Sequence, residues 1–392
     1  MSPRASTLRP LPTCQRPIKT VARVATLRVG NGTRAILPLL WGLIFGSGFT
    51  SVVHALTGPV VVHPNSDEQI VFTFSKQNAA DTAVINSFES TAAEQHIARA
   101  KQALLGFQAS ANPRFLGDAQ RELAGVAEVD YSADFYLYRA SLRQSLHQFS
   151  QASSDLDLVA QMQPSNFQAQ MMRFTIAFVI GDYSAAELAC EKLQGLNNDL
   201  YVAVCRQHVR AAQRPSEAES AYLDLKSAMA SAGALADRQA LAWAAGSLAD
   251  IAERAGRDDA AQLWQWVLSM NANDAYARAR LAALKLAAED YAAVIVLTAD
   301  HLTVDSLAVL NAIAARREGG GEALISQLRE RFNEALWRGE VLHKRAYAQF
   351  LLDIEDTPST ALTWAERNWQ DQREWPDAQL LARARRAAGA GL

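Results

Sequence analysis

The sequence predicts an all-α protein built from pairs of helices stacked in series. Residues after about position 80 are rich in Ala, Leu, Glu, Gln and Arg, which favour helices, and β patterns are scarce there. A small apolar residue also returns at intervals of 29 to 42 residues. A return at such a period is typical of stacked helical pairs. The recurring positions are Ala119, Ala152, Ala186, Ala218, Ala260, Val294, Ala323 and Ala361.

The charge of the 392-residue chain is unevenly distributed, although the net value is only -3. Residues 1–55 carry seven of the 38 Lys and Arg residues and no acidic residue. The remainder therefore has 31 basic and 41 acidic residues, a net charge of -10. Because nonspecific nucleic-acid binding needs a basic face, we expect no nucleic-acid partner.

Residues 1–55 have the pattern of a basic leader followed by a signal peptide. An apolar segment at 35–53 follows the acid-free leader and ends at Val53-His54-Ala55, a small-x-small cleavage pattern. We expect cleavage after Ala55 and export to the periplasm. The alternative is an uncleaved anchor at 35–53, which would leave the repeats as a periplasmic part of an inner-membrane protein. The leader is long for a signal peptide, so a translation start near Val29 is a further hypothesis.

Three further segments follow. Residues 56–87 are predicted to be an extended tether, with 60–62 and 70–74 as possible short strands. Residues 88–376 form the helical repeats, and residues 377–392 form a C-terminal capping helix and tail.

The repeat region shows apolar residues at helical spacing, interrupted by Pro, Gly and Asn. Pro113 and Pro164 break the pattern after helices, and Pro215 is well placed at a helix start. The pattern loses its period between 304 and 340. The expected helices are 92–108, 116–126, 136–148, 150–162, 167–180, 184–196, 200–212, 216–231, 235–255, 259–270, 275–287, 291–299, 306–317, 322–337, 341–354, 358–370 and 376–388.

Several of these residues resemble the tetratricopeptide repeat (TPR) family. The resemblance is carried by Gly181-Asp182-Tyr183 with Ala186, Glu289-Asp290-Tyr291, Phe149 with Ala152, and the helix ends at Pro164 and Asn273. It spans 88–376 and is closest in 133–196 and 242–300. The interval of 42 residues near 231–237 departs from the family and implies a longer loop or helix there. The resemblance implies a right-handed superhelix of antiparallel helix pairs, a right-handed α-solenoid. It also implies a concave groove lined by the first helix of each pair, which binds a protein or peptide and does not catalyse a reaction.

Six residues on the expected first helices are predicted to line that groove: Gln168, Met171, Thr175, Trp243, Asp250 and Tyr276. Family members that bind a terminal carboxylate use Lys, Arg and Asn in the groove. Because this set lacks them, we do not expect a terminal carboxylate as the ligand. The predicted function is an exported scaffold or assembly factor for a protein or peptide partner, with no cofactor and no resident metal.

Cys190 and Cys205 lie at about equal distances from the turn at Asn197-Asn198, so they share one height in an antiparallel pair. A disulfide suits an oxidising compartment, but helix axes about 8–10 Å apart exceed the Cα separation of about 7 Å that a disulfide allows. Buried free thiols are the alternative. A third possibility is a zinc or copper site, because Glu187 with Cys190 and Cys205 with His208 form two pairs spaced three residues apart.

No motif in the sequence predicts an enzyme. Asp300-His301 and His343 with Asp353 lack a nearby nucleophile and are interpreted as surface groups. The second-ranked function is therefore an enzyme or metal-handling accessory protein centred on Cys190–His208. Trp264 and Trp266 cannot share one helix face, so we expect one in the core and one near the surface. Trp364, Trp369 and Trp375 are expected to seal the last repeat.

Overall fold

The computed structural model describes residues 90–110, 112–194, 199–233, 238–339, 341 and 343–389. The chain divides into residues 1–83 and residues 84–392, and every described residue belongs to the second unit. The predicted leader, signal or anchor segment and tether therefore lie outside the described residues. Within the described ranges, no helix combines the length and the apolar character needed to cross a bilayer.

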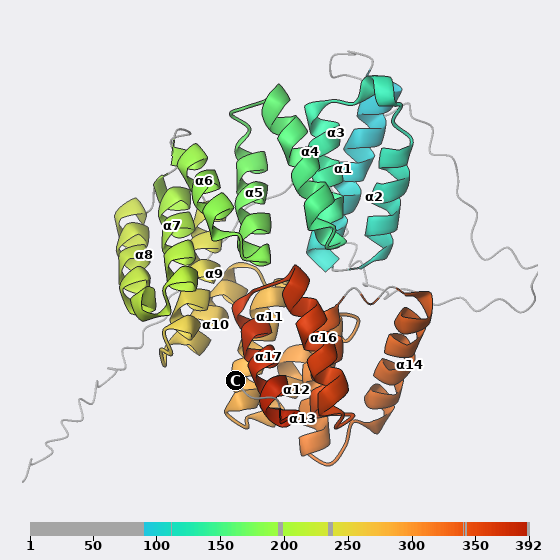
Figure 1. The fold of residues 1–392 in the computed structure, drawn as a ribbon, viewed down its shortest axis with the longest axis vertical. Coiled ribbons are helices and arrows are strands. Elements are labelled where there is room, and N and C mark those ends of the chain that lie inside the picture. Colours follow the sequence, from blue (N-terminus) through green and yellow to red (C-terminus); the bar gives the residue numbers. More distant parts are fainter. Residues whose placement is uncertain are drawn as a thin grey trace, which may run out of the picture. The chain divides into compact units, whose positions relative to one another are not determined.

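The described residues form seventeen α-helices (Figure 1). The helices are α1 (Ala92–Ser110), α2 (Arg114–Ala124), α3 (Ala133–Ser145), α4 (Phe149–Met162), α5 (Phe167–Ile180), α6 (Tyr183–Gln194), α7 (Asp199–Gln213), α8 (Ala218–Ala232), α9 (Arg238–Arg254), α10 (Ala260–Met270), α11 (Ala275–Ala287), α12 (Tyr291–Thr298), α13 (Asp305–Arg317), α14 (Glu322–Arg338), α15 (Lys344–Asp353), α16 (Pro358–Asp371) and α17 (Trp375–Ala387). Each corresponds to one helix expected from the sequence. The all-α prediction is confirmed for the described residues.

The helices pack in series along the chain. Pairs such as α3 with α4, α5 with α6 and α15 with α16 pack most extensively. The first helices of successive pairs also contact each other, for example α1 with α3 and α13 with α15. This arrangement confirms the prediction of helix pairs packed in series. The region without a clear period, 304–340, still contains a pair, but α14 packs chiefly against α13.

The recurring small residue lies at the contact inside each pair. Its side chain is at most 3 % exposed at Ala119, Ala152, Ala186, Ala218, Ala260, Val294 and Ala361. Ala323 was a wrong assignment, because it is exposed and Ile325 is buried in its place. Helix α14 begins at Glu322, so Ile325 is its fourth residue, as Ala186 is in α6.

The Gly-Asp-Tyr sequence forms a compact turn between two helices. Gly181 ends α5 with a φ of 77°, a left-handed conformation that glycine adopts without strain. The Asp182 carboxylate then accepts a hydrogen bond from the Ala185 amide at 3.0 Å and caps α6. Glu289 and Asp290 repeat this geometry before α12, with a φ of 58° at Glu289 and a side-chain cap on Ala293.

The tryptophans occupy both core and surface positions. The Trp264 side chain is 1 % exposed in the core, whereas Trp266 is 40 % exposed, which confirms the prediction for this pair. Trp364 and Trp369 pack against the core of α15–α17. Trp375 instead faces a cavity that is described below.

Candidate binding site on the inner face

Two cavities are lined mainly by α5, α7, α9, α11, α13, α15 and α17, and we call the surface that these helices present to the cavities the inner face. A cavity of about 430 Å³ opens here between α5, α7, α9 and α11, and we call it the first cavity. Its walls carry aromatic side chains, and its polar groups include three carboxylates. The aromatic residues are Phe174, Phe178, Trp243, Trp264 and Tyr276, and the carboxylates are those of Asp250, Asp274 and Glu374.

The six groove residues predicted from the sequence have different positions. Thr175, Trp243, Asp250 and Tyr276 all line the first cavity. Met171 is half-buried among the core residues beside it, and Gln168 is exposed and outside the lining. The structure thus brings four of the six together. Phe178 and Arg254 were missed, although each lies one helical turn after a cavity residue, Phe174 and Asp250 respectively.

Asp250 is a buried junction between three helices. Its carboxylate is 2.9 Å from His208 Nε2 on α7 and accepts a hydrogen bond from Arg254 Nε at 2.6 Å. The Tyr276 hydroxyl on α11 lies 3.5 Å away. Burial alone would raise the pKa of Asp250, but Arg254 and His208 together hold it well below its usual range. The ionised carboxylate of Asp250 on α9 therefore connects this helix to α7 and α11.

Glu253 makes a second buried junction beside the first. Arg280 on α11 pairs with its carboxylate, and the Trp264 indole N–H on α10 donates to the same group. Burial raises the pKa of Glu253, and Arg280 opposes that shift. Both junctions position the aromatic walls before any ligand arrives.

A second cavity of about 850 Å³ lies between α11, α13, α15 and α17. Five arginines line it: Arg280, Arg317, Arg345, Arg383 and Arg386. Arg345 pairs with Glu374 at 3.2 Å and with Asp377 at 3.1 Å, and Arg383 pairs with Asp353. Within the described residues, Arg317 and Arg386 have no ion pair. None of these arginines was among the predicted groove residues, which end at Tyr276.

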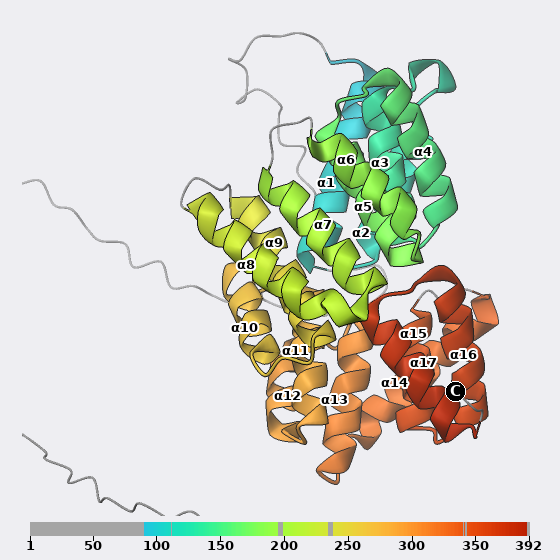
Figure 2. The same ribbon diagram turned by 60° about the vertical axis from the view of Figure 1, so that its left-hand side comes forward.

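The connection from α16 to α17 lies between the two cavities, and we call residues 372–375 the closing segment. Glu374 lines the first cavity, Trp375 lines the second, and Tyr276 lines both. The Arg373 amide donates a hydrogen bond of 2.7 Å to the Val179 carbonyl of α5. Figures 1 and 2 show this connection beside the end of α5.

Two further contacts join residues that are far apart in the sequence. The Arg254 guanidinium lies 5.6 Å from the centre of the Trp375 ring. The rings of His147, between α3 and α4, and His343, before α15, have centres 6.1 Å apart. The connections before α4 and before α15, far apart in the sequence, therefore lie close together.

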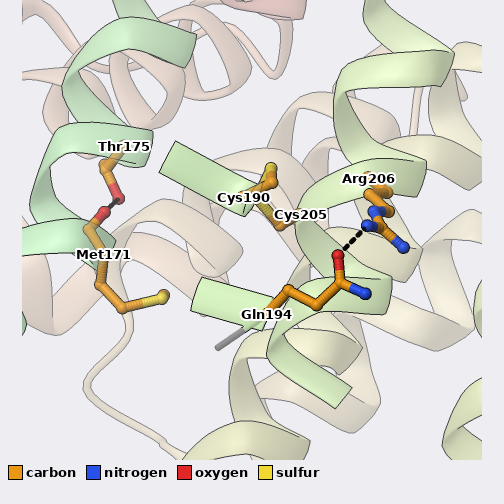
Figure 3. The surroundings of a disulfide bond; sticks show 6 residues. All are labelled: Met171, Thr175, Cys190, Gln194, Cys205 and Arg206. Atoms are coloured by element: carbon orange, nitrogen blue, oxygen red, sulfur yellow. Dashed lines mark hydrogen bonds between the residues drawn. A yellow bond between two sulfur atoms is a disulfide. The ribbon is translucent and has the colours of Figure 1, made fainter. Parts of the chain in front are cut away.

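A disulfide joins Cys190 of α6 to Cys205 of α7, with the two Cα atoms 5.8 Å apart (Figure 3). Beside it, Arg206 donates to the Gln194 side chain at 2.7 Å, which also links α6 to α7. Backbone Cα atoms lie about 2.3 Å from the helix axis, so facing residues approach more closely than the axes do. Of the three alternatives for these cysteines, the structure contains the disulfide, because its Cα limit of about 7 Å applies to Cα atoms and not to helix axes.

The proposed alternative metal ligands do not gather into one site. The two cysteines are bonded to each other, His208 contacts Asp250, and Glu187 is exposed. Across the part of the chain that the structure describes, no group of three or more His, Cys, Asp or Glu side chains is arranged to hold a metal ion. His343 lies at the surface and bonds to Asp305, not to Asp353.

Likeness to known proteins is found among solved structures. No protein-family model matches the chain, and no curated protein matches it. The crystal structure of the P58(IPK) TPR domain aligns with 76 % of this chain and 99 % of that one, at 14 % sequence identity and a TM-score of 0.19. At that TM-score the likeness adds nothing to the fold assignment, which rests on the helix contacts above.

Proposed function

We propose that this protein is a noncatalytic scaffold or assembly factor that binds a protein or peptide on its inner face. The observation that carries the proposal is the first cavity, where aromatic side chains from α5, α9, α10 and α11 converge on a small set of polar groups. Such a combination of apolar walls and few polar groups is typical of ligand sites. The buried junctions at Asp250 and Glu253 hold the walls in place, which reduces the entropy lost on binding.

The sequence resemblance to TPR proteins supports the same function, since TPR domains generally bind proteins. We further propose that the helix pairs follow a right-handed superhelix, as the family does, and that its concave side is the inner face. The cysteines of the enzyme or metal-handling alternative are joined to each other, so no specific observation favours that second function.

We also propose that the protein is exported to the periplasm. The support is the basic and apolar pattern of residues 1–55 and the disulfide, which suits an oxidising compartment. Sequencing the N-terminus of the natural protein tests the proposal, with a start just after Ala55 expected. A mature product that begins at Met1 and stays in the cytoplasm would contradict it.

Photo-crosslinking in living cells tests the binding function. A photoreactive residue replaces Gln239, which is exposed and lines the first cavity, and the control variant carries it at Leu188 of α6, which is 55 % exposed. We expect a discrete crosslinked partner from position 239 only, and its loss when Trp243→Ala is added. No adduct at 239, or the same adduct from both positions, would refute an inner-face site.

A further inference from the structure

The closing segment has the geometry of a bound peptide. Its backbone is extended at Gln372, with φ and ψ of -135° and 132°, and at Glu374, with -74° and 167°. The Arg373 amide between them donates to the Val179 carbonyl. A free carbonyl near the end of α5 is thus satisfied by a segment far away in the sequence.

The side chain of Arg373 fits a position where α5 has no side chain. A Cβ atom at Gly181 would lie 2.8 Å from Arg373 Cδ and 3.3 Å from Arg373 Cβ, closer than ordinary packing permits. The absence of a side chain at Gly181 therefore lets the stem of Arg373 lie directly on the backbone. Gly181 serves both the turn before α6 and this close approach.

Two residues after Arg373, the aromatic ring of Trp375 lies beside the guanidinium cation of Arg254 on α9. Arg254 lies 5.6 Å from the Trp375 ring and 5.8 Å from the Phe178 ring, so its guanidinium contacts both. Arg254 is itself held by Asp250 at 2.6 Å. Because that ion pair does not involve the closing segment, the cation stays in place when Trp375 leaves.

The closing contact is small compared with the serial packing. Helix α16 packs extensively on α15 and α17 but touches α5 through few residues. A limited contact between helices far apart in the series opens more easily than the continuous core does.

We propose that the closing segment is an internal pseudo-ligand. The site on α5 and α9 accepts an extended peptide that has a long side chain at one position and an aromatic side chain two positions later. Such a segment of a partner displaces residues 373–375 from Val179, Gly181 and Arg254. This inference rests on the function proposed above and specifies its ligand.

A fluorescently labelled peptide with the sequence of residues 371–377 is the probe, and its binding to the full-length protein is measured by anisotropy. Trp375→Ala weakens the closing contact, so we expect it to bind the peptide about tenfold or more tightly than the wild type, because less of the protein is self-occupied. Trp337→Ala removes a side chain that is 86 % exposed and distant in sequence, and it should match the wild type. A peptide with alanine in place of its tryptophan should not bind.

A covalent lock provides a second, independent measurement. In the double variant Gly181→Cys with Arg373→Cys, the Cβ atoms would lie near the spacing of about 3.5–4.5 Å that a disulfide needs. The oxidised lock should not bind the peptide, and mild reduction should restore binding. The native Cys190–Cys205 bond is buried and should resist that treatment.

Several results would overturn the pseudo-ligand. In the anisotropy experiment, the peptide would fail to bind Trp375→Ala, or it would bind that variant and the wild type equally. In the lock experiment, the disulfide would fail to form, or the oxidised lock would still bind the peptide. The crosslink at position 239 separates this inference from the proposed function. A partner captured there while the peptide fails leaves the inner-face site standing and removes only the pseudo-ligand.

Discussion

Two neighbouring regions of the molecule are held together by different interactions. Around α5, α6 and α7, the core consists of Phe174, Phe178, Leu193, Val202 and other apolar side chains, joined across the helices by the disulfide. Around α9, α11, α15 and α17, the inner face depends on ion pairs that are largely removed from water. We call these the apolar region and the charged region.

The two regions should differ in how well they tolerate substitution. Apolar contacts are nondirectional, so a core accepts substitutions that conserve volume. A buried ion pair depends on both partners, and removing one leaves a charge without compensation. The charged region should therefore define the geometry of the binding face, while the apolar region supplies bulk stability.

The largest effect is expected for Asp250→Asn. It leaves Arg254, whose side chain is 8 % exposed, without its carboxylate, and breaking such a pair costs about 3–5 kcal/mol. Chemical unfolding measures the loss. The control is Asp224→Asn, which removes a carboxylate 56 % exposed and should change stability by less than about 0.5 kcal/mol. Equal losses of stability in the two variants would show that the buried ion pair contributes no more than the surface pair.

The same variant should change the response to acid. The pKa of Asp250 is lowered on folding, so its contribution to stability is complete well above its usual value of 3.8 and is lost as the pH falls through and below that value. Wild-type stability should therefore fall more steeply below about pH 5 than that of Asp250→Asn. Parallel acid profiles would show that Asp250 is not the group responsible.

In the apolar region, Cys190→Ala with Cys205→Ala should have the next largest effect. The bond closes a loop with a sequence separation of 15, for which the loss is about 3 kcal/mol. The double variant should melt at a lower temperature, and reductant should destabilise the wild type but not the variant. No difference between wild type and variant in the absence of reductant would show that the bond adds nothing.

A smaller loss is expected where two helices of a pair meet. Ala186 is fully buried, and Ala186→Trp overpacks this contact at a cost of about 1–3 kcal/mol. Its neighbour Ala185 is exposed, so Ala185→Trp on the same helix is a matched control and should be nearly neutral. If the two variants have the same thermal unfolding midpoint, the recurring small position has no packing role.

The smallest effect is predicted for Trp337→Ala at the end of α14. The side chain is 86 % exposed, and a surface substitution of this kind changes stability by about 0.5 kcal/mol or less. Urea unfolding checks it. A large loss would mean that α14 packs more tightly than its limited contacts indicate.

Much of the fold could be predicted because its signals are local. Helical spacing, the cap at Asp182 and the breaks at Pro113 and Pro164 each act within a few residues. The start of α14 at Glu322 agrees with the expected helix, but the residue assigned to the contact was wrong. Ala323 has the small side chain of the recurring position, whereas the fourth residue of the helix, Ile325, is the one that is buried.

The site could be predicted only in part for a different reason. Helix faces indicated Trp243, Asp250 and Tyr276, since each lies on a first helix with apolar neighbours at helical spacing. Glu374 and Trp375 reach the inner face only through a contact between α5 and a segment far along the chain. No periodic pattern encodes such a contact, because it depends on how all the intervening pairs are rotated.

The closing segment joins α5 to a part of the helix series that is far away in the sequence. The most direct test is hydrogen exchange of the Arg373 amide, which lies between two helices and donates to Val179. We predict marked protection of this amide in the wild type, with loss of that protection in Trp375→Ala while α16 and α17 stay protected. Exchange of the wild-type Arg373 amide at the rate of an unprotected loop would contradict it.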